Sequence, residues 1–330
     1  MAVSIADIQK LRKMTGAGLS DCKKALTETE GNFDKAVEII REKGQAIAAK
    51  RSDRETSNGC VLVKYADNFG AIVALKCETD FVANGADYIK LTQDILDAAV
   101  AAKAKSLDEV KELTLADGTK VLDAVVARSG ITGEKMELDG YNFIEGENIS
   151  TYDHMGKHTL CTMVLTNKAA EEQAHAIAMQ VAAMKPMFLD EASVSQEFIE
   201  EEKKVAAEKT KQELVQKAVD AALKKAGINP AHVDSEEHME SNMGKGWITA
   251  EDVAKAKEII ATVSAEKAAN LPAQMIENIV KGRINRIYKE NCLLNQEFIQ
   301  DSKLSVADYL KAADKDLTVV DYKRFSLSAD

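Results

Sequence analysis

The residues best suited to act on another molecule are Thr79, Asp80 and Phe81, inside the run Lys76-Cys-Glu-Thr-Asp-Phe-Val-Ala83. A carboxylate next to an aromatic ring can form a polar-plus-wedge pair directed at a partner, which is recognition chemistry. The alternative is structural: Thr79 or Asp80 caps a helix, contributing about 1 kcal/mol, and Phe81 is a core residue whose burial contributes roughly 1.5–3 kcal/mol. Caps are routine at helix starts, so the local pattern alone favours the structural interpretation.

The segments on either side predict where these residues lie. Gly70–Cys77 is apolar and β-branched and follows the turn formers around Asn68, which predicts a buried strand. After the run, apolar residues recur at helical spacing and predict a helix: Ile89, Leu91, Ile95, Leu96 and Ala99. We therefore expect Thr79–Phe81 at a corner where a strand is followed by a helix.

Composition bounds the class of protein. The chain has 330 residues, 45% of them hydrophobic and 29% charged, which predicts two or more globular domains. It has no apolar run long enough to span a bilayer. The start, Met1–Asp7, has neither a secretory apolar region nor an Arg-rich transit pattern, so we expect a cytoplasmic protein with no membrane partner.

Charge and motifs narrow the function classes. A net charge of -11 would repel a phosphate backbone, and only 5% of residues are aromatic, so we expect no direct nucleic-acid partner. The sequence contains no phosphate-binding loop motif, no G-x-S-x-G nucleophile motif and no H-E-x-x-H zinc motif. We therefore expect no covalent chemistry, no cofactor and no metal. His154 and His158 flank a predicted turn, and we expect exposed hairpin residues there and not a metal-binding pair.

The cysteines have the pattern of reduced structural thiols. There are five, widely spaced and without a C-x-x-C pair. A thiol enzyme using Cys77 and a histidine is an alternative, but the sequence has neither a base nor an oxyanion motif to support it.

The overall pattern predicts an α+β fold that begins with a three-helix docking module over residues 1–55. Ser4 and Asp7 resemble a capping box, and the first helix carries Ile5, Ile8 and Leu11. The second helix is expected over Leu19–Leu26, and the third begins near Phe33 and ends at Gly44. Such small bundles resemble ubiquitin-associated domains, which serve in docking. A polar linker follows, Lys50–Gly59.

Two antiparallel-sheet-plus-helix subdomains are expected next, because a hairpin followed by a helix occurs twice. The first subdomain spans 56–140, and the second combines 141–194 with 291–330. The expected elements are the hairpin Cys60–Tyr65 with Ala71–Cys77, the hairpin Glu147–Met155 with His158–Thr166, the helix Ala169–Met184, a short helix at Val306–Leu310 and the strand Leu317–Phe325.

Residues 195–290 are rich in Ala, Glu and Lys and predict an inserted antiparallel helical arm of the coiled-coil kind. Its expected apolar stripes are Val205, Leu214, Ala218 and Ala221, then Val253, Ile260 and Val263, then Ile276, Val280, Ile284 and Ile287. The arm is either a solvated projection or a homodimer contact, and interfacial and core stripes look alike in sequence.

Several motifs, in order, resemble the elongation factor Ts family. Leu11-Arg-Lys-Met-Thr-Gly-Ala-Gly18 with Asp21–Leu26 resembles its amino-terminal signature, and Cys77-Glu-Thr-Asp-Phe-Val-Ala83 its central motif. Later landmarks are Ala178–Ala183 with Lys185-Pro186, Val280–Arg283 and Cys292-Leu-Leu-Asn-Gln-Glu-Phe-Ile299. The resemblance covers most of the chain but poorly covers 209–265, a stretch that looks longer than the arm of many relatives.

The resemblance implies a guanine nucleotide exchange factor for the GTPase elongation factor Tu. The corner Thr79–Val82 would enter the GTPase near its magnesium site, with Phe81 as the wedge and Asp80 perturbing the polar network around Mg²⁺. This implication favours the outward orientation of Phe81. It also implies docking contacts at Arg12, Leu19 and Lys23, at His154 and at Ile299. The alternative class is a helical-arm scaffold that recruits partners and has no exchange activity.

Overall fold

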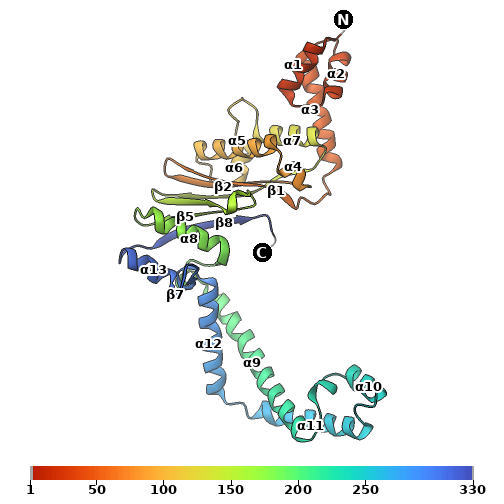
Figure 1. Ribbon diagram of the computed structural model, residues 1–330, viewed down its shortest axis with the longest axis vertical. Helices are drawn as coiled ribbons and strands as arrows, with labels where there is room; N and C mark the ends of the chain where they lie inside the picture. The colour runs from red at the N-terminus through yellow and green to blue at the C-terminus, as the bar shows by residue number, and fades with distance from the viewer. Residues whose placement is uncertain (1–2, 329–330) are drawn as a thin grey trace. The chain divides into compact units, whose positions relative to one another are not determined.

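The computed structural model describes residues 3–328, apart from the side chain of Ala48. The fold is α+β, as predicted. The chain forms two compact units: one comprises the residues up to Leu189 together with those from Glu297, and the other comprises Asp190–Gln296. The strands lie in the first unit, and the long helices α9 (Gln196–Lys225) and α12 (Ala273–Asn291) belong to the second (Figure 1).

The first unit begins with three helices, α1 (Ile5–Thr15), α2 (Leu19–Glu28) and α3 (Phe33–Lys50). The capping box at the start of α1 is present, because the Ser4 hydroxyl accepts from the Asp7 N–H at 3.1 Å and the Asp7 carboxylate accepts from Ser4. The buried residues of this small bundle are Leu11, Ala17, Cys22, Ala25, Leu26 and Ala36. The likeness to ubiquitin-associated domains stays a prediction.

Of the apolar residues named on the first helix, Leu11 is buried and Ile5, in the first turn, is exposed. One detail of the predicted bundle is wrong: Gly44 does not end the third helix, which continues to Lys50. A Cβ at Gly44 would lie 3.2 Å from the Val126 carbonyl oxygen, and one at Gly130 would lie 2.5 Å from the Gly44 Cα. The two glycines therefore allow α3 and α7 (Val121–Thr132) to pack backbone against backbone.

The first sheet has the antiparallel order β1-β2-β3, with β1 at Asn58–Ala66, β2 at Phe69–Cys77 and β3 at Met136–Glu145. The predicted first hairpin is confirmed, with Cys60 opposite Leu75 and Tyr65 opposite Gly70. Asp67 and Asn68 both adopt positive φ, at 51° and 62°, as a tight two-residue hairpin turn requires.

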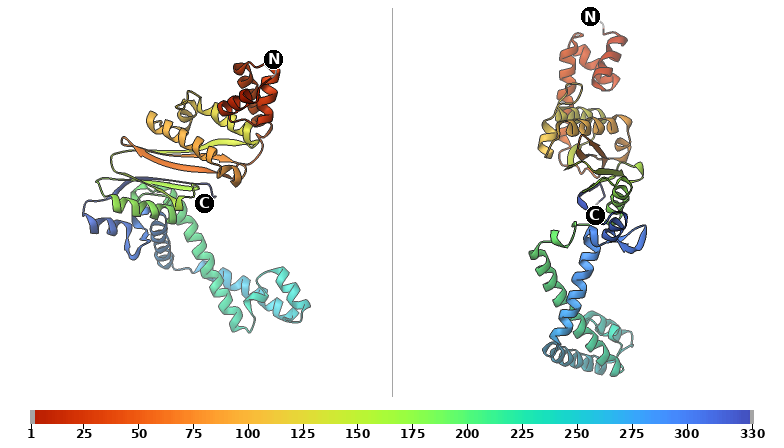
Figure 2. Two further views of the ribbon diagram at one scale, coloured as in Figure 1. Left: turned by 45° about the horizontal axis from the view of Figure 1, so that its top comes forward. Right: turned by 90° about the vertical axis from the view of Figure 1, so that its left-hand side faces the viewer.

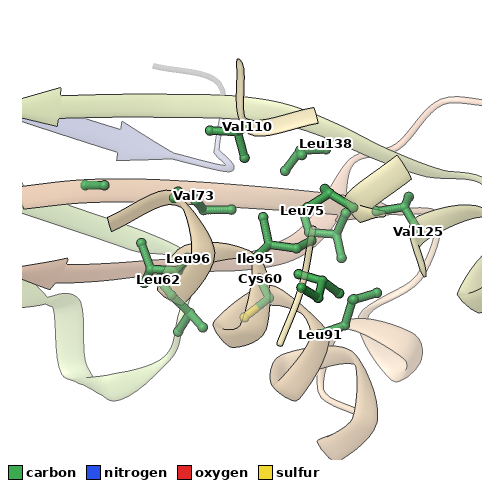
Figure 3. Packing of buried hydrophobic residues seen from close by; sticks show 14 of the residues in the cluster. Cys60, Leu62, Val73, Leu75, Leu91, Ile95, Leu96, Val110, Val125 and Leu138 are labelled. Atoms are coloured by element: carbon green, nitrogen blue, oxygen red, sulfur yellow. The ribbon is translucent and has the colours of Figure 1, made fainter. Parts of the chain in front are cut away.

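Both faces of β2 are buried, which explains why its sequence is apolar without alternation. On one face Val73 and Leu75 pack against α5 (Ala86–Ala102), α6 (Leu107–Glu112) and α7. Figure 3 shows this core, where Ile95 and Leu96 of α5 point toward the sheet. On the other face Ile72 and Ala74 pack with residues of the second sheet.

The second sheet has the order β4-β5-β8, with β4 at Ile149–Asp153, β5 at Leu160–Thr166 and β8 at Val319–Ser326. The second hairpin and the C-terminal strand are thus confirmed. The remaining elements here are α8 (Glu171–Met184), α13 (Val306–Ala313) and a two-stranded sheet of β6 (Glu297–Phe298) and β7 (Asp301–Ser305). β3 crosses residue 140, where we placed a boundary, and the division into subdomains stays a prediction.

The second unit is helical, with α9 at Gln196–Lys225, α10 at Glu236–Gly244, α11 at Ala250–Ala269 and α12 at Ala273–Asn291. Helix α9 packs against α12 and α11, and α12 runs back beside it (Figures 1 and 2). Far along α9 a separate core forms from Val219, Leu223, Ile228, Val233, Met239, Ile248 and Ala256.

The predicted stripe on α9 is wrong at two positions. Val205 and Ala221 are exposed, whereas Ala206, Val219 and Leu223 are buried. In a helix rich in Ala and Lys several faces are equally apolar, so the neighbouring helix decides which is covered. Helix α10, capped by the Ser235 hydroxyl, was not predicted.

Short 3₁₀ turns complete the described chain: His154–Gly156, Glu191–Ser193, Pro230–His232 and Leu293–Asn295. Within residues 3–328, no helix is long and apolar enough to cross a membrane.

Candidate functional site

The corner after β2 is a capped, four-residue helix, α4 (Asp80–Ala83). Thr79 has extended backbone angles, φ -123° and ψ 151°, and its hydroxyl accepts from the Val82 N–H at 3.4 Å. The helix-cap part of the structural interpretation is therefore correct. Asn84 follows α4 and donates its side-chain amide to the Asp80 carbonyl at 2.8 Å.

The Phe81 ring is not a core residue, because the side chain is 86% exposed. Asp80 beside it is also exposed. Val82 is half-buried against the core and Ala83 is buried, so the short helix turns Val82 inward and Phe81 outward. Of the four predicted corner residues, Thr79, Asp80 and Phe81 are thus presented to solvent, and Val82 is anchored to the core.

Two carboxylates from different parts of the chain hold the corner. Glu134, just after α7, accepts from the Thr79 N–H at 3.1 Å and from the Thr79 hydroxyl at 2.6 Å. Glu78 accepts from the Lys135 N–H at 2.6 Å, and each of its two carboxylate oxygens accepts from the same Arg51 guanidinium nitrogen at 2.8 Å. Sequence reasoning missed Glu134 and Arg51, since no local pattern predicts a pairing across such sequence distances.

The hydrogen bonds to Glu78 also affect its titration. The Lys135 N–H and the Arg51 guanidinium stabilise the ionised carboxylate, and together they hold the pKa of Glu78 below its usual range. Glu78 is therefore a charged anchor directly before Thr79 at neutral pH.

The cysteines do not resemble those of a thiol enzyme. All five are buried. Burial raises the pKa of Cys77, whose thiol donates to the Thr79 carbonyl at 3.2 Å, and it raises the pKa of Cys60 to about 12. A buried thiol with a raised pKa is a poor nucleophile. Cys77 instead contributes to the packing beneath the corner.

The turn between β4 and β5 carries His154. His154 is half-buried, and its Nδ1 lies 3.1 Å from the Tyr152 hydroxyl. Met155 after it is exposed and has a positive φ of 57°. The turn is fixed at its end, where Asp153 accepts from the His158 N–H at 3.1 Å and the His158 carbonyl accepts from the Val61 N–H at 2.7 Å.

The corner and this turn line one hollow of about 250 Å³. Asp80, Ala83 and Asn84 contribute one side, and Lys157 with His158 contributes another. The structure thus brings the corner close to the segment that follows His154, although the two are far apart in sequence. Among the described residues, no cluster of three or more histidine, cysteine or acidic side chains could hold a metal ion.

The remaining predicted residues lie elsewhere in the same unit. Arg12 on α1 and Lys23 on α2 are exposed, and so is Leu19 at the first position of α2. Met14 is exposed between them in sequence and was not predicted. Ile299 lies between β6 and β7, also exposed, with its N–H donated to the Gln180 side-chain carbonyl at 2.8 Å.

Comparison with known proteins decides the family. The family model described as Elongation factor TS matches residues 78–229 and 216–329. The chain belongs to the elongation factor Ts family. Proteins named elongation factor Ts from Bacteroides fragilis and Bacteroides thetaiotaomicron are 68% and 66% identical to it, and one from Porphyromonas gingivalis is 43% identical. Each alignment spans 100% of both chains.

Membership in this family implies a nucleotide exchange factor that acts in translation elongation. The relatives match over their whole length, so the residues 209–265 that the motifs cover poorly are shared with them.

Proposed function

We propose that this chain releases GDP from elongation factor Tu by inserting the corner Thr79–Val82 beside the magnesium site of the GTPase. In this mechanism Phe81 is the wedge, and the Asp80 carboxylate perturbs the polar network around Mg²⁺. The observation that carries the proposal is the 86% exposure of a large apolar ring on a backbone that is capped and held by two carboxylates. Exposure of such a ring to water is unfavourable, and its burial in a partner is therefore favourable for binding.

Exchange of this kind is linkage and not bond chemistry. A factor that binds the nucleotide-free GTPase more tightly than the GDP form weakens GDP binding by the same factor. Each tenfold acceleration requires about 1.4 kcal/mol of differential stabilisation in the transition state for release. Burial of Phe81 supplies roughly 1.5–3 kcal/mol, which corresponds to one or two decades. Larger acceleration requires Asp80 and the docking contacts.

The proposed docking contacts are Arg12, Leu19 and Lys23 on the N-terminal helices, His154 and Ile299. Their support is that four of them are exposed, and that His154 adjoins the turn whose later residues share a hollow with Asp80. These remote contacts would keep the complex together when the wedge is removed. They would also give the wedge its position relative to the GTPase.

The proposed setting is the cytoplasm, with elongation factor Tu as partner and without direct nucleic-acid contact. A net charge of -11 supports the last point. A homodimer contact through the arm is also proposed, because Val205 on α9 and Met275 on α12 are exposed. Sedimentation of the wild type and of a Val205→Glu/Met275→Glu variant tests this, and two monomeric sedimentation profiles would contradict it.

The experiment that tests the function is stopped-flow release of a fluorescent GDP analogue from elongation factor Tu. We expect the wild type to accelerate release and Asp80→Ala/Phe81→Ala to lose most of the acceleration. Acceleration by both proteins would move the site elsewhere. No acceleration by the wild type with a cognate GTPase would favour the scaffold alternative.

A further inference from the structure

The wedge depends on a residue outside the corner. We propose that Glu134 is a positioning residue for nucleotide exchange, because its carboxylate fixes Thr79 and thereby the direction in which Asp80 and Phe81 point. This inference rests on the proposed function of the corner.

The need for such a residue follows from the size of α4. Four residues form barely one turn, and a helix this short is unstable alone, since nucleation fixes several dihedral angles for a single hydrogen bond. The Phe81 side chain is 86% exposed, so burial in the core does not fix its orientation. Its direction is therefore set by the backbone just before it, at Thr79.

Glu134 holds Thr79 in two ways. One carboxylate oxygen accepts the Thr79 N–H at 3.1 Å, and the other accepts the Thr79 hydroxyl proton at 2.6 Å. Because the Thr79 hydroxyl donates its proton to Glu134, its oxygen lone pairs remain free to accept from the Val82 N–H. This bond from Val82 to the Thr79 oxygen is the cap of α4. A single carboxylate thus fixes the backbone of Thr79 and directs its cap.

Glu134 is itself held by its own segment. Its carbonyl accepts from the Ser129 hydroxyl at 2.5 Å, and its N–H donates to the Thr132 hydroxyl at 3.3 Å. Gly133 before it adopts φ 74°, which ends α7 and directs the chain toward β3. The position of the carboxylate therefore follows α7, the helix that packs against α3 at the Gly44–Gly130 contact.

The pairing of the two segments is reciprocal. Glu134 binds Thr79, while Glu78, the residue before Thr79, binds the N–H of Lys135, the residue after Glu134. Two short segments thus exchange carboxylates and hold each other in place. Charge-assisted hydrogen bonds of this kind are stronger than neutral ones and fix geometry. The corner is pre-organised before any partner binds, which lowers the entropic cost of binding.

The test is release of fluorescent GDP from elongation factor Tu, titrated with full-length exchange factor to obtain the saturating rate and the half-saturating concentration. We expect Glu134→Ala to lower the saturating rate roughly threefold to tenfold. This is the effect of losing hydrogen bonds to a charged group when water replaces part of them. The half-saturating concentration stays within about twofold, since the docking residues are unchanged. Glu134→Gln keeps an acceptor for the Thr79 N–H and restores most of the rate.

The matched control is Glu145→Ala, which removes an exposed carboxylate paired with Lys105 at the far end of β3 and leaves both parameters unchanged. Thr79→Val removes the hydroxyl that bonds Glu134 and, with it, the cap on Val82, so it is read only through the double variant, in which Glu134→Ala adds little to the loss in saturating rate. If Glu134→Ala destabilises the fold, the comparison of Glu134→Gln with wild type decides, and a Gln variant that loses most of the saturating rate overturns the inference.

A saturating rate of Glu134→Ala within about twofold of wild type overturns the inference. So does a Gln variant as slow as the Ala variant, or a loss confined to the half-saturating concentration. These comparisons require that the wild-type protein accelerates GDP release in the same assay. Failure of the wild type itself would instead overturn the proposed function.

Discussion

Phe81 and Trp247 are both large exposed aromatic residues, with 86% and 62% of their surface accessible, but their surroundings differ. The Trp247 ring lies 5.5 Å from the His232 ring and 5.0 Å from the Lys245 ammonium, and the backbone N–H of Trp247 donates to the Asn242 carbonyl at 3.0 Å. For Phe81, the described part of the chain shows no ring or cation contact.

The comparison shows that exposure alone does not identify a contact residue. Trp247 has its stacking and cation contacts within its own unit, directly before Ile248 of the small core there. Phe81 has no such contacts, but the backbone that carries it is held by Glu134 and Glu78. An apolar ring without partners on a fixed backbone is the combination expected of a binding residue.

The strongest test of this difference is the pair Phe81→Ala and Trp247→Ala. We expect Phe81→Ala to reduce accelerated GDP release about 10-fold to 100-fold, the equivalent of roughly 1.5–3 kcal/mol of lost burial. The free energy of unfolding changes by less than about 0.5 kcal/mol, because the ring is already exposed. Trp247→Ala leaves release within about twofold. Stopped-flow release and thermal unfolding measure both, and equal losses in the two variants would remove the distinction.

A smaller effect on exchange is expected from Asp80→Asn. This change keeps the shape and the exposure of the side chain and removes only its charge. Release falls about 10-fold if the charge acts on the ion site, and the loss is greatest at low ionic strength. The measurement is release at several Mg²⁺ concentrations. A variant with wild-type release at every concentration would assign the effect to Phe81 alone.

The pH dependence of the free energy of unfolding tests whether the Glu78 carboxylate holds the backbone that carries Phe81. Because its folded pKa lies below the usual value of 4.5, its contribution is present above that pH and is lost as pH falls through the folded pKa. At neutral pH, Glu78→Gln costs roughly 1 kcal/mol, and at a pH below the folded pKa the two proteins converge. Urea unfolding followed by circular dichroism measures this.

The control for that experiment is Glu145→Gln, whose exposed ion pair with Lys105 contributes little. A Glu78→Gln difference that persists unchanged in acid would show that the carboxylate acts by packing and not by charge.

The smallest effect is expected at Lys245. Lys245→Ala removes the ammonium above the Trp247 ring, a contact worth about 0.5–1 kcal/mol at an exposed site. We expect faster amide hydrogen exchange between Met243 and Ile248 and no change in GDP release. Unchanged exchange protection there would mean that the Trp247 ring is held by His232 and its backbone alone.

Local patterns predicted much of the fold. The apolar run of β2 predicted a strand, the Thr79 side chain predicted a cap, and Ser4 with Asp7 predicted a capping box. These features depend on neighbours in sequence, so sequence determines them directly. The family motifs then led to the corner, which local pattern alone would have assigned to the core.

The errors arose where tertiary contacts decide. Gly44 reads as a helix stop, but its contact with Gly130 makes the same residue a packing surface. Val205 reads as part of a stripe until a neighbouring helix covers another face of α9. Glu134 has no local signal at all, because its partner Thr79 lies 55 residues away. A single sequence does not record which distant segments meet.

Trp247 has a use independent of its role in packing. It is the only tryptophan among the 330 residues, and it belongs to the Asp190–Gln296 unit. Its intrinsic fluorescence is therefore a natural label for that unit, whereas circular dichroism averages over the whole chain. Melting curves recorded with both signals would reveal whether the arm unfolds together with the sheet-containing unit or as a separate cooperative block, without any engineered dye.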